Sequence, residues 1–119
     1  MQDFKKLKLW QESKELVLDI YEATKKFPKT EQYGMAQQMR RAAYSISSNI
    51  AEGTGKNSQK EFARFLYMAN GSAKEVENFL ILARDLGYLG KDSFKELNEK
   101  IERIGKMNYR LIQTIQIRK

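Results

Sequence analysis

Histidine and cysteine are both absent from this sequence of 119 residues. Without Cys, the chain forms no disulfide, offers no thiolate nucleophile and provides no thiolate metal ligand. Without His, it lacks the side chain that titrates near neutral pH and most often binds transition metals. Catalytic triads and the common zinc sites are therefore excluded, and we expect no enzyme activity and no cofactor. Catalysis by paired carboxylates or by a carboxylate-bound hard cation stays open as an alternative.

Long apolar runs are absent as well. No stretch approaches the roughly 18 residues of a membrane span, and the start Met-Gln-Asp-Phe-Lys-Lys lacks the apolar segment of a signal peptide. We therefore expect a soluble, cytoplasmic protein without a membrane partner. At this length, the chain is expected to form one domain, residues 1–119, around a single core.

Proline and glycine are scarce, and their positions divide the chain into helical segments. The one proline, Pro28, ends the first segment because the residue before a proline is disfavoured in the α region. Ser58 and Glu61 have the spacing of a capping box, in which each side chain bonds the other residue's backbone N–H, and Ser93 and Glu96 repeat it. We predict an all-α protein, an antiparallel up-and-down four-helix bundle with helices at about 6–27, 31–52, 58–86 and 93–117.

The helix predicted at 31–52 carries an organised polar face. At about 100° per residue, one stripe can face a core and comprises Met35, Met39, Ala42, Ala43, Ile46 and Ile50. About 140° away by the same period lies a polar stripe of Arg41, Ser45, Ser48 and Glu52, with Asn49 at its flank. Ser and Asn compete for backbone hydrogen bonds inside helices. This face therefore either serves a polar site or a helix contact, or is a helix wall with incidental serines.

The helix predicted at 58–86 is too apolar to face only one core. Beyond a core stripe, four more apolar residues widen its apolar surface to roughly 200°, namely Met68, Phe79, Leu82 and Leu86. Gly71 and Ser72 would let another helix approach closely, although a glycine inside a helix costs about 1 kcal/mol relative to Ala. We therefore predict that this helix also forms the subunit interface of a homo-oligomer.

Acidic residues are few where basic residues gather. The formal net charge is +7, and six bases face only two acids between Gln32 and Lys74. From Arg103 to Lys119 there are five bases and no acid. Such clusters favour a polyanion, and we predict that RNA or DNA binds at Arg40, Arg41, Lys56, Lys60 and Arg64. A basic charge that serves only solubility or an acidic protein partner is the alternative.

Two further patterns resemble functional sites. Gly53-Thr-Gly-Lys56 is similar to part of a phosphate loop, but Ile50 and Asn57 stand where that motif needs Gly and Ser or Thr. Tyrosines can stack on bases, yet a Tyr on an amphipathic helix is more often a core or boundary residue. We interpret the helical tyrosines, Tyr67 and Tyr109 among them, in that structural sense.

Several segments, taken in order, resemble one family closely. They include Leu9-Trp10-Gln11, Phe27-Pro28, the run from Gln38 to Ala42, the Ser-Asn-Ile-Ala-Glu-Gly run that ends at Gly53, and Gly71-Ser72-Ala73. The family is the bacterial four helix bundle family named for proteins encoded in 23S rRNA intervening sequences, and the likeness covers nearly the whole chain. Many members have Pro where this chain has Ser47, so a proline kink in this helix is not expected.

The resemblance implies an up-and-down four-helix bundle that assembles into a ring-like homopentamer. It also implies nucleic-acid affinity, because the accessory variability protein of diversity-generating retroelements looks like a relative with a basic pentameric barrel that engages nucleic acid and a reverse transcriptase. The family itself has no well-established activity. Carried over position by position, its motif and helix-contact residues are Arg40, Arg41, Ser45, Ser48, Asn49, Glu52, Gly53, Gly71, Ser72 and Glu75.

The sequence leaves two main hypotheses for function. In the first, a non-enzymatic homo-oligomer binds RNA or DNA through a basic surface. In the second, an oligomeric assembly adaptor recruits a protein partner without binding nucleic acid, and the motif residues lock helices together. The surroundings of Arg41 separate the two: solvent around Arg40 and Arg41 favours the first, whereas an ion pair that buries Arg41 against Glu52 or Glu75 favours the second.

Overall fold

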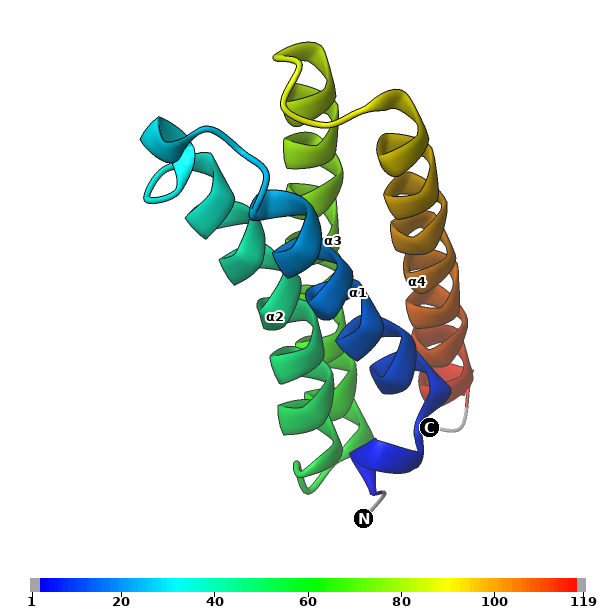
Figure 1. Cartoon of the computed structure of the whole chain (residues 1–119). Coiled ribbons are helices and arrows are strands. Elements are labelled where there is room, and N and C mark those ends of the chain that lie inside the picture. Colours follow the sequence, from blue (N-terminus) through cyan, green and yellow to red (C-terminus); the bar gives the residue numbers. More distant parts are fainter. Residues whose placement is uncertain (1–2, 118–119) are drawn as a thin grey trace.

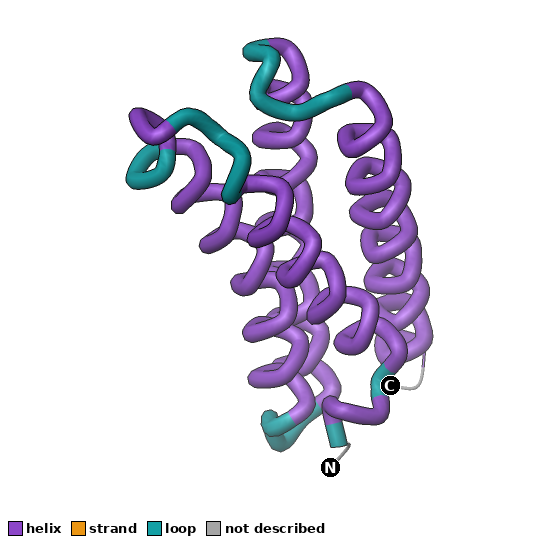
Figure 2. The backbone as a smooth tube through the Cα atoms, viewed as in Figure 1, coloured by secondary structure: helices purple, strands orange, loops and turns teal. Residues whose placement is uncertain are grey.

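Four α-helices make up nearly all of the computed structural model, which describes residues 3–117 (Figure 1). They are α1 (Lys8–Thr24), α2 (Met35–Thr54), α3 (Gln59–Asp85) and α4 (Lys91–Ile117), with short 3₁₀ turns η1 (Phe4–Lys6) and η2 (Lys29–Glu31). Successive helices run in opposite directions, and Figure 2 shows helices and loops but no strand over the described residues. The predicted all-α four-helix bundle is confirmed.

The helices pack around one elongated core. α2 and α3 lie against each other along their lengths, α1 packs on α2, and α4 packs on α3. α1 crosses the bundle obliquely, so that its second half diverges from α4 (Figure 1). Every helix contributes side chains that are fully buried, among them Leu16, Ile20, Met39, Ile46, Ile50, Leu66, Leu80, Ile101 and Ile104.

The first two helices are shorter than predicted at their facing ends. α1 stops at Thr24 instead of Phe27, and α2 begins at Met35 instead of Glu31. Between them, η2 makes a tighter turn, and the Glu31 carboxylate accepts a hydrogen bond from the Met35 backbone N–H at 3.3 Å. Glu31 therefore satisfies one of the free donors that every helix start leaves. The periodicity of the sequence could not separate this turn from the helix that follows it.

Ser58 caps α3 as predicted, because its Oγ accepts from the Glu61 backbone N–H at 3.1 Å. The predicted return bond from the Ser58 N–H to the Glu61 carboxylate is not formed among the described residues, and that carboxylate accepts from Arg64 instead. The second capping box is wrong. α4 begins at Lys91, so Ser93 already lies inside the first turn, and the Phe94 backbone N–H donates to Gly90 O at 2.9 Å. Gly90 thus takes the cap position three residues before Ser93, where the Ser-x-x-Glu spacing indicates it.

The end of α3 has the hydrogen bonds of a Schellman motif. Gly87 has a φ of 78°, the Gly87 N–H donates to Arg84 O at 3.0 Å, and the Tyr88 N–H donates to Ala83 O at 2.9 Å. Only a glycine adopts this left-handed conformation at little cost. The motif turns the chain sharply, so that α4 returns along α3.

One buried polar side chain joins the last two helices. Asn108 is buried in α4, and its Nδ2 donates to the backbone carbonyl of Leu66 in α3 at 2.9 Å. Its Oδ1 is buried without a hydrogen-bond partner among the described residues. Because a slide of one helix along the other would break the one bond that Asn108 makes, this residue sets the register of α3 against α4.

The apolar faces lie largely where the sequence indicated. In α2, the stripe through Met39, Ala42, Ala43, Ile46 and Ile50 is buried, whereas Met35 is half-buried. In α3, Met68, Leu82 and Leu86 are 46%, 40% and 54% exposed, and Phe79 is half-buried. These four side chains therefore remain on the surface of the single chain. Within the described residues, no helix combines the length and the apolar character needed to cross a membrane.

Candidate functional site

The five basic residues predicted to bind nucleic acid do not form one patch. Arg40 and Arg41 lie in the first half of α2, whereas Lys56 follows α2, and Lys60 and Arg64 lie in the first turns of α3. At 1.5 Å per residue, Arg41 and Lys56 are on the order of 20 Å apart along the axis of α2. The structure therefore divides the predicted set into a pair on α2 and a group at one end of the bundle.

Arg40 is engaged inside the protein. Its Nε donates to Thr24 Oγ1 at 2.8 Å, and its Nη2 donates to Gln32 Oε1 at 3.1 Å. Its guanidinium also lies over the Tyr21 ring, 5.2 Å from the centroid. These contacts join α2 to the end of α1 and to the connection between the two helices. Sequence reasoning missed this role because Thr24 and Gln32 are 16 and 8 residues away from Arg40.

Arg41, one position later, points elsewhere. Its side chain is exposed, and no hydrogen bond or ion pair joins it to another residue within the part of the chain that the structure describes. Glu52 and Glu75, the partners considered for it, are exposed as well and take part in none of the ion pairs found between residues 3 and 117. Arg41 is thus available to an external anion.

The other residues of the α2 polar stripe also make few contacts within the chain. Ser45 and Asn49 are half-buried, and Asn49 Nδ2 donates to the Ser45 carbonyl at 2.9 Å within the same helix. Ser48 is exposed like Arg41 and Glu52. The stripe consequently faces outward beside α3, and the packing of one chain does not account for it.

At the end of the bundle, two cations flank one aromatic ring. Lys56 Nζ and the Arg64 guanidinium each lie 4.9 Å from the centroid of the Phe65 ring. Arg64 also forms a two-pronged ion pair with Glu61, with Nε and Nη2 each 3.2 Å from a carboxylate oxygen. The hydrogen bond from Arg64 lowers the pKa of Glu61 and raises the pKa of Arg64. Glu61 therefore competes with any phosphate for Arg64.

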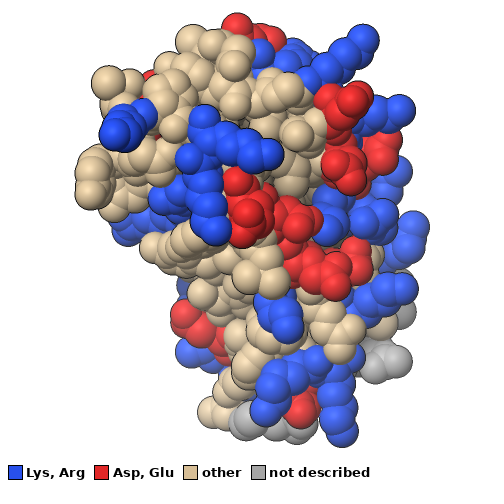
Figure 3. Space-filling view, in the orientation of Figure 1, with Lys and Arg blue, Asp and Glu red and all other residues tan. Residues whose placement is uncertain are grey.

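The start of the chain adds basic residues to this end. η1 packs on α2 near the α2–α3 connection (Figure 1), and it carries the exposed Lys5 and Lys6. Lys60 is exposed at the start of α3. Figure 3 shows Lys and Arg side chains at the same lower end of the molecule. We name Lys5, Lys6, Lys56, Lys60 and Arg64 the basic end; sequence reasoning missed the first two because their neighbours lie some fifty residues later.

Two motif glycines have different surroundings. A Cβ on Gly53 would lie 2.8 Å from Phe62 Cδ1 and 3.0 Å from Phe65 Cβ, so the last turn of α2 approaches α3 closely at this point. A Cβ on the exposed Gly71 would meet nothing within 4 Å. The packing of a single chain therefore requires Gly53 and does not require Gly71. Next to Gly71, Ser72 is half-buried, and Glu75 is exposed one turn later.

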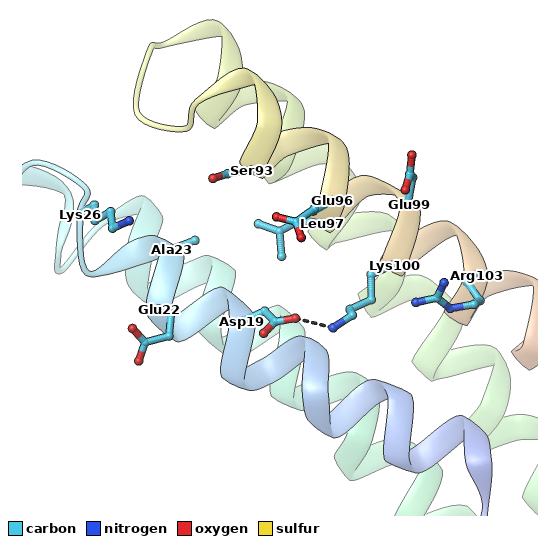
Figure 4. A pocket seen from close by; sticks show the side chains of 10 residues that line it. All are labelled: Asp19, Glu22, Ala23, Lys26, Ser93, Glu96, Leu97, Glu99, Lys100 and Arg103. Carbon is cyan, nitrogen blue, oxygen red and sulfur yellow. Dashed lines mark hydrogen bonds and ion pairs between the residues drawn. The ribbon is translucent and has the colours of Figure 1, made fainter.

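A groove of about 430 Å³ separates the diverging parts of α1 and α4 (Figure 4). Its lining mixes the acids Asp19, Glu22, Glu96 and Glu99 with the bases Lys26, Lys100 and Arg103. Asp19 on α1 and Lys100 on α4 point toward each other and form an ion pair. Among residues 3–117, no group of three or more acidic side chains is placed to hold a metal ion. Acidic side chains line this groove together with basic side chains, so the groove does not present a purely acidic cluster.

Comparisons with known proteins agree with this architecture. The family model described as "23S rRNA-intervening sequence protein" matches residues 5–110. A crystal structure from Bacteroides thetaiotaomicron VPI-5482, described as a protein with unknown function from the S23 ribosomal protein family, is 27% identical in sequence with a TM-score of 0.80. The match covers 87% of this chain and 97% of that chain. No curated protein matches the sequence.

Proposed function

Because the chain belongs to the 23S rRNA-intervening sequence protein family, we propose that it is a non-enzymatic homo-oligomer that binds RNA or DNA through a basic surface. The observation that carries this proposal is the basic end, where η1, the α2–α3 connection and the start of α3 bring exposed cations together. Clustered Lys and Arg side chains attract the phosphates of a polyanion and release its condensed counterions. Such contacts supply affinity without reading sequence.

The five residues predicted from the sequence contribute unequally to this function, and only three of them belong to the basic end. Lys56 and Lys60 are exposed and offer their ammonium groups to phosphate, while Arg64 must leave Glu61 to do so. Arg41 adds an exposed contact outside the basic end, in the first half of α2. Arg40 supports the fold instead, because Thr24 and Gln32 already accept two of its hydrogen bonds.

The outer side of α3 supports self-association. Met68, Ser72, Glu75, Phe79, Leu82 and Leu86 recur at alternating intervals of four and three residues, which is the spacing of a seam between two helices. Gly71 beside this seam lets a neighbouring backbone come close, and nothing in its own chain uses that space. We propose that copies of the chain pack along this seam, and that the assembly is the homopentamer implied by the family resemblance.

The same seam is also consistent with the second hypothesis, an adaptor that recruits a protein partner. Exposed apolar side chains on α3 beside the outward-facing polar stripe of α2 also suit a protein partner. In both functions, the protein acts in the cytoplasm and needs no cofactor. Crosslinking and sequencing of nucleic acid bound in the native cell, together with identification of copurified proteins, separates the two.

Salt dependence tests the nucleic-acid function directly. The affinity for labelled RNA and DNA of about 20 nucleotides is measured by fluorescence anisotropy at salt concentrations from about 50 to about 200 mM. The logarithm of the binding constant should fall steeply with the logarithm of salt, and Arg41→Gln and Lys60→Gln should each reduce the slope by about 1. Lys91→Gln, at the opposite end of the bundle, is the matched control and should leave the slope unchanged. Binding that ignores salt, or no binding, refutes the proposal.

A further inference from the structure

A second groove runs along the outer side of the bundle between α3 and α4. It has a volume of about 380 Å³, and its lining includes Asn70 and Lys74 from α3 and Gly105, Lys106, Tyr109 and Arg110 from α4. None of these residues belongs to the basic end. This groove and the groove that α1 borders share no lining residue.

Two exposed tyrosines belong to this side of the bundle. Tyr109 lines the groove, and Tyr67 lies one turn before the lining residue Asn70, on the same side of α3. Tyr67 and Tyr109 are 53% and 61% exposed. They directly follow Leu66 and Asn108, which are joined by a hydrogen bond across α3 and α4, so the backbones of the two tyrosines lie at about the same height in the bundle. Gln116 Nε2 donates to the Tyr67 hydroxyl at 3.3 Å, and Gln113 Nε2 donates to the Tyr109 hydroxyl at 3.1 Å. These bonds hold each hydroxyl while much of each ring remains open to solvent.

Cations alternate with these rings. On α3, Lys60, Arg64, Tyr67 and Lys74 are all exposed and recur at intervals of four, three and seven residues, which places them on one side of the helix. On α4, Lys106 and Arg110 lie on either side of Tyr109 in sequence, and both line the groove. The groove thus continues from the basic end along α3.

The acids at the groove already have partners on their own helices. Glu77 forms an ion pair with Lys74 at 3.4 Å, so Lys74 must leave Glu77 to hold a phosphate. Glu102 accepts a hydrogen bond from Asn98 at 2.8 Å. From Arg103 onward, α4 carries no acid at all. The lower part of the groove therefore presents only cationic and neutral side chains from α4.

Gly105 opens the groove from the α4 side. A glycine inside a helix is destabilising relative to Ala, and a Cβ on Gly105 would meet nothing within 4 Å. The packing of the chain itself therefore does not require a glycine here. Its missing side chain leaves room beside Tyr109 for a flat group that lies against the ring.

We propose that this groove binds a single unpaired strand of nucleic acid, with bases stacked on Tyr67 and Tyr109 and phosphates held by Lys74, Lys106 and Arg110. Stacking on a side chain needs a base whose face is free, and the bases of a duplex offer none. A duplex would gain only phosphate contacts. The inference rests on the proposed nucleic-acid function and adds to it the class of nucleic acid and the residues that select it.

Anisotropy titrations with oligouridylate, oligothymidylate and a duplex of equal length test this selection. Wild-type protein should bind both single strands more tightly than the duplex, and the two single strands together show whether the sugar matters. The double variant Tyr67→Leu/Tyr109→Leu should lose roughly tenfold or more in affinity for single strands, since stacking contributes about 1–3 kcal/mol per base. Its salt slope and duplex affinity should not change, because no charge is removed.

Two controls separate stacking from other causes. Tyr67→Phe/Tyr109→Phe keeps both rings and should keep the affinity within about twofold, given that the stacking energy resides in the ring. Tyr33→Leu removes an exposed tyrosine near the start of α2 and should have no effect. Photocrosslinking of 5-iodouridine oligonucleotide to wild-type protein should label Tyr67 or Tyr109, a readout that requires no variant.

The outcomes distinguish this inference from the function on which it rests. Equal affinity of the leucine double variant, or a wild-type preference for duplex, overturns the stacking groove even if Lys60→Gln still reduces the salt slope. In that case, the nucleic-acid function stands. Failure of wild-type protein to bind any of the three probes overturns both.

Discussion

Arg40 and Arg41 are neighbours in the sequence, yet their side chains meet different surroundings. A helix turns by about 100° per residue, which directs Arg40 toward the α1–α2 connection and leaves Arg41 exposed. From the sequence, the two adjacent arginines were equally good candidates for phosphate binding. Only the partners of Arg40, which come from other segments, separate the two residues.

These surroundings predict that two alanine substitutions differ in their effect on stability. Arg40→Ala should lower the free energy of unfolding by about 1–3 kcal/mol, because it removes charge-assisted hydrogen bonds to Thr24 and Gln32 and leaves these groups without their partner. Arg41→Ala should change it by less than about 0.5 kcal/mol. Urea unfolding measures both values. A large loss of stability in Arg41→Ala, or none in Arg40→Ala, would contradict this assignment.

Glu61 provides a second residue-level test, because its carboxylate holds Arg64. Glu61→Gln should raise affinity for nucleic acid at low salt by about two- to fivefold, in keeping with the modest strength of exposed ion pairs. Anisotropy titration measures the change. Glu22→Gln is a matched control, since Glu22 forms the same i,i+3 ion pair with Lys25 on α1, outside the basic end. An equal gain in both variants would show that only net charge matters.

The pH dependence of this ion pair has a defined sign. The pKa of Glu61 is lowered, chiefly by the hydrogen bond from Arg64, so the ion pair is intact above the ordinary glutamate pKa. It is lost as pH falls through the lowered pKa, where protonation releases Arg64. The advantage of Glu61→Gln over wild-type protein should therefore shrink in that acidic range.

At the scale of single helices, the two glycines of the family motif make different demands. Gly53→Ala should lower the free energy of unfolding by about 1–3 kcal/mol, because its Cβ would press on Phe62 and on the Cβ of Phe65. Gly71→Ala should raise the stability of the separate chain by about 1 kcal/mol, because alanine favours the helix. Thermal or urea unfolding at low protein concentration measures both.

Gly71→Ala also tests the proposed seam on α3. If a neighbouring subunit uses the space beside Gly71, the same substitution that stabilises one chain should weaken the assembly. Sedimentation of the variant against wild-type protein measures this second effect. An assembly that is unchanged or tighter would remove Gly71 from the interface.

Helix ends were the least predictable part of each helix. The Ser58 cap was correctly predicted because a capping box acts within four residues of chain. The same pattern at Ser93 does not form the helix start, because α4 already begins at Lys91, directly after Gly90. A capping pattern offers one possible helix start, and the turn that precedes it decides whether that start is used.

At the scale of the whole molecule, the exposed apolar residues of α3 predict an assembly. Light scattering should give a mass several times the 13.9 kDa of one chain. Leu82→Glu should dissociate it, because the substitution places a charge in the proposed apolar seam. Leu18→Glu is the control, since Leu18 is an exposed leucine of α1 outside this seam. Wild-type protein that stays monomeric across micromolar concentrations would contradict our interpretation of α3.

The distribution of charge is likewise a property of the whole fold. Lys60 and Arg64 were identified from the sequence as members of a basic cluster, but Lys5 and Lys6 were not, because their relation to α3 depends on how η1 packs against α2. Tyr67 and Tyr109 were interpreted as structural residues, and the register set by Asn108 places them at one level on neighbouring helices, with Tyr109 lining the groove between α3 and α4. Neither arrangement has a signature within one segment.

Local and periodic features were readable from the sequence alone. The number and order of the helices, the buried stripe of α2, the cap at Ser58 and the excess apolar width of α3 all depend on spacing within one segment, where helix geometry acts directly. The tertiary structure alone decided which basic residues lie together, which arginine is engaged by the fold and which tyrosines come to one level on neighbouring helices. Those outcomes depend on the packing and register of different helices, and helix periodicity carries no information about either.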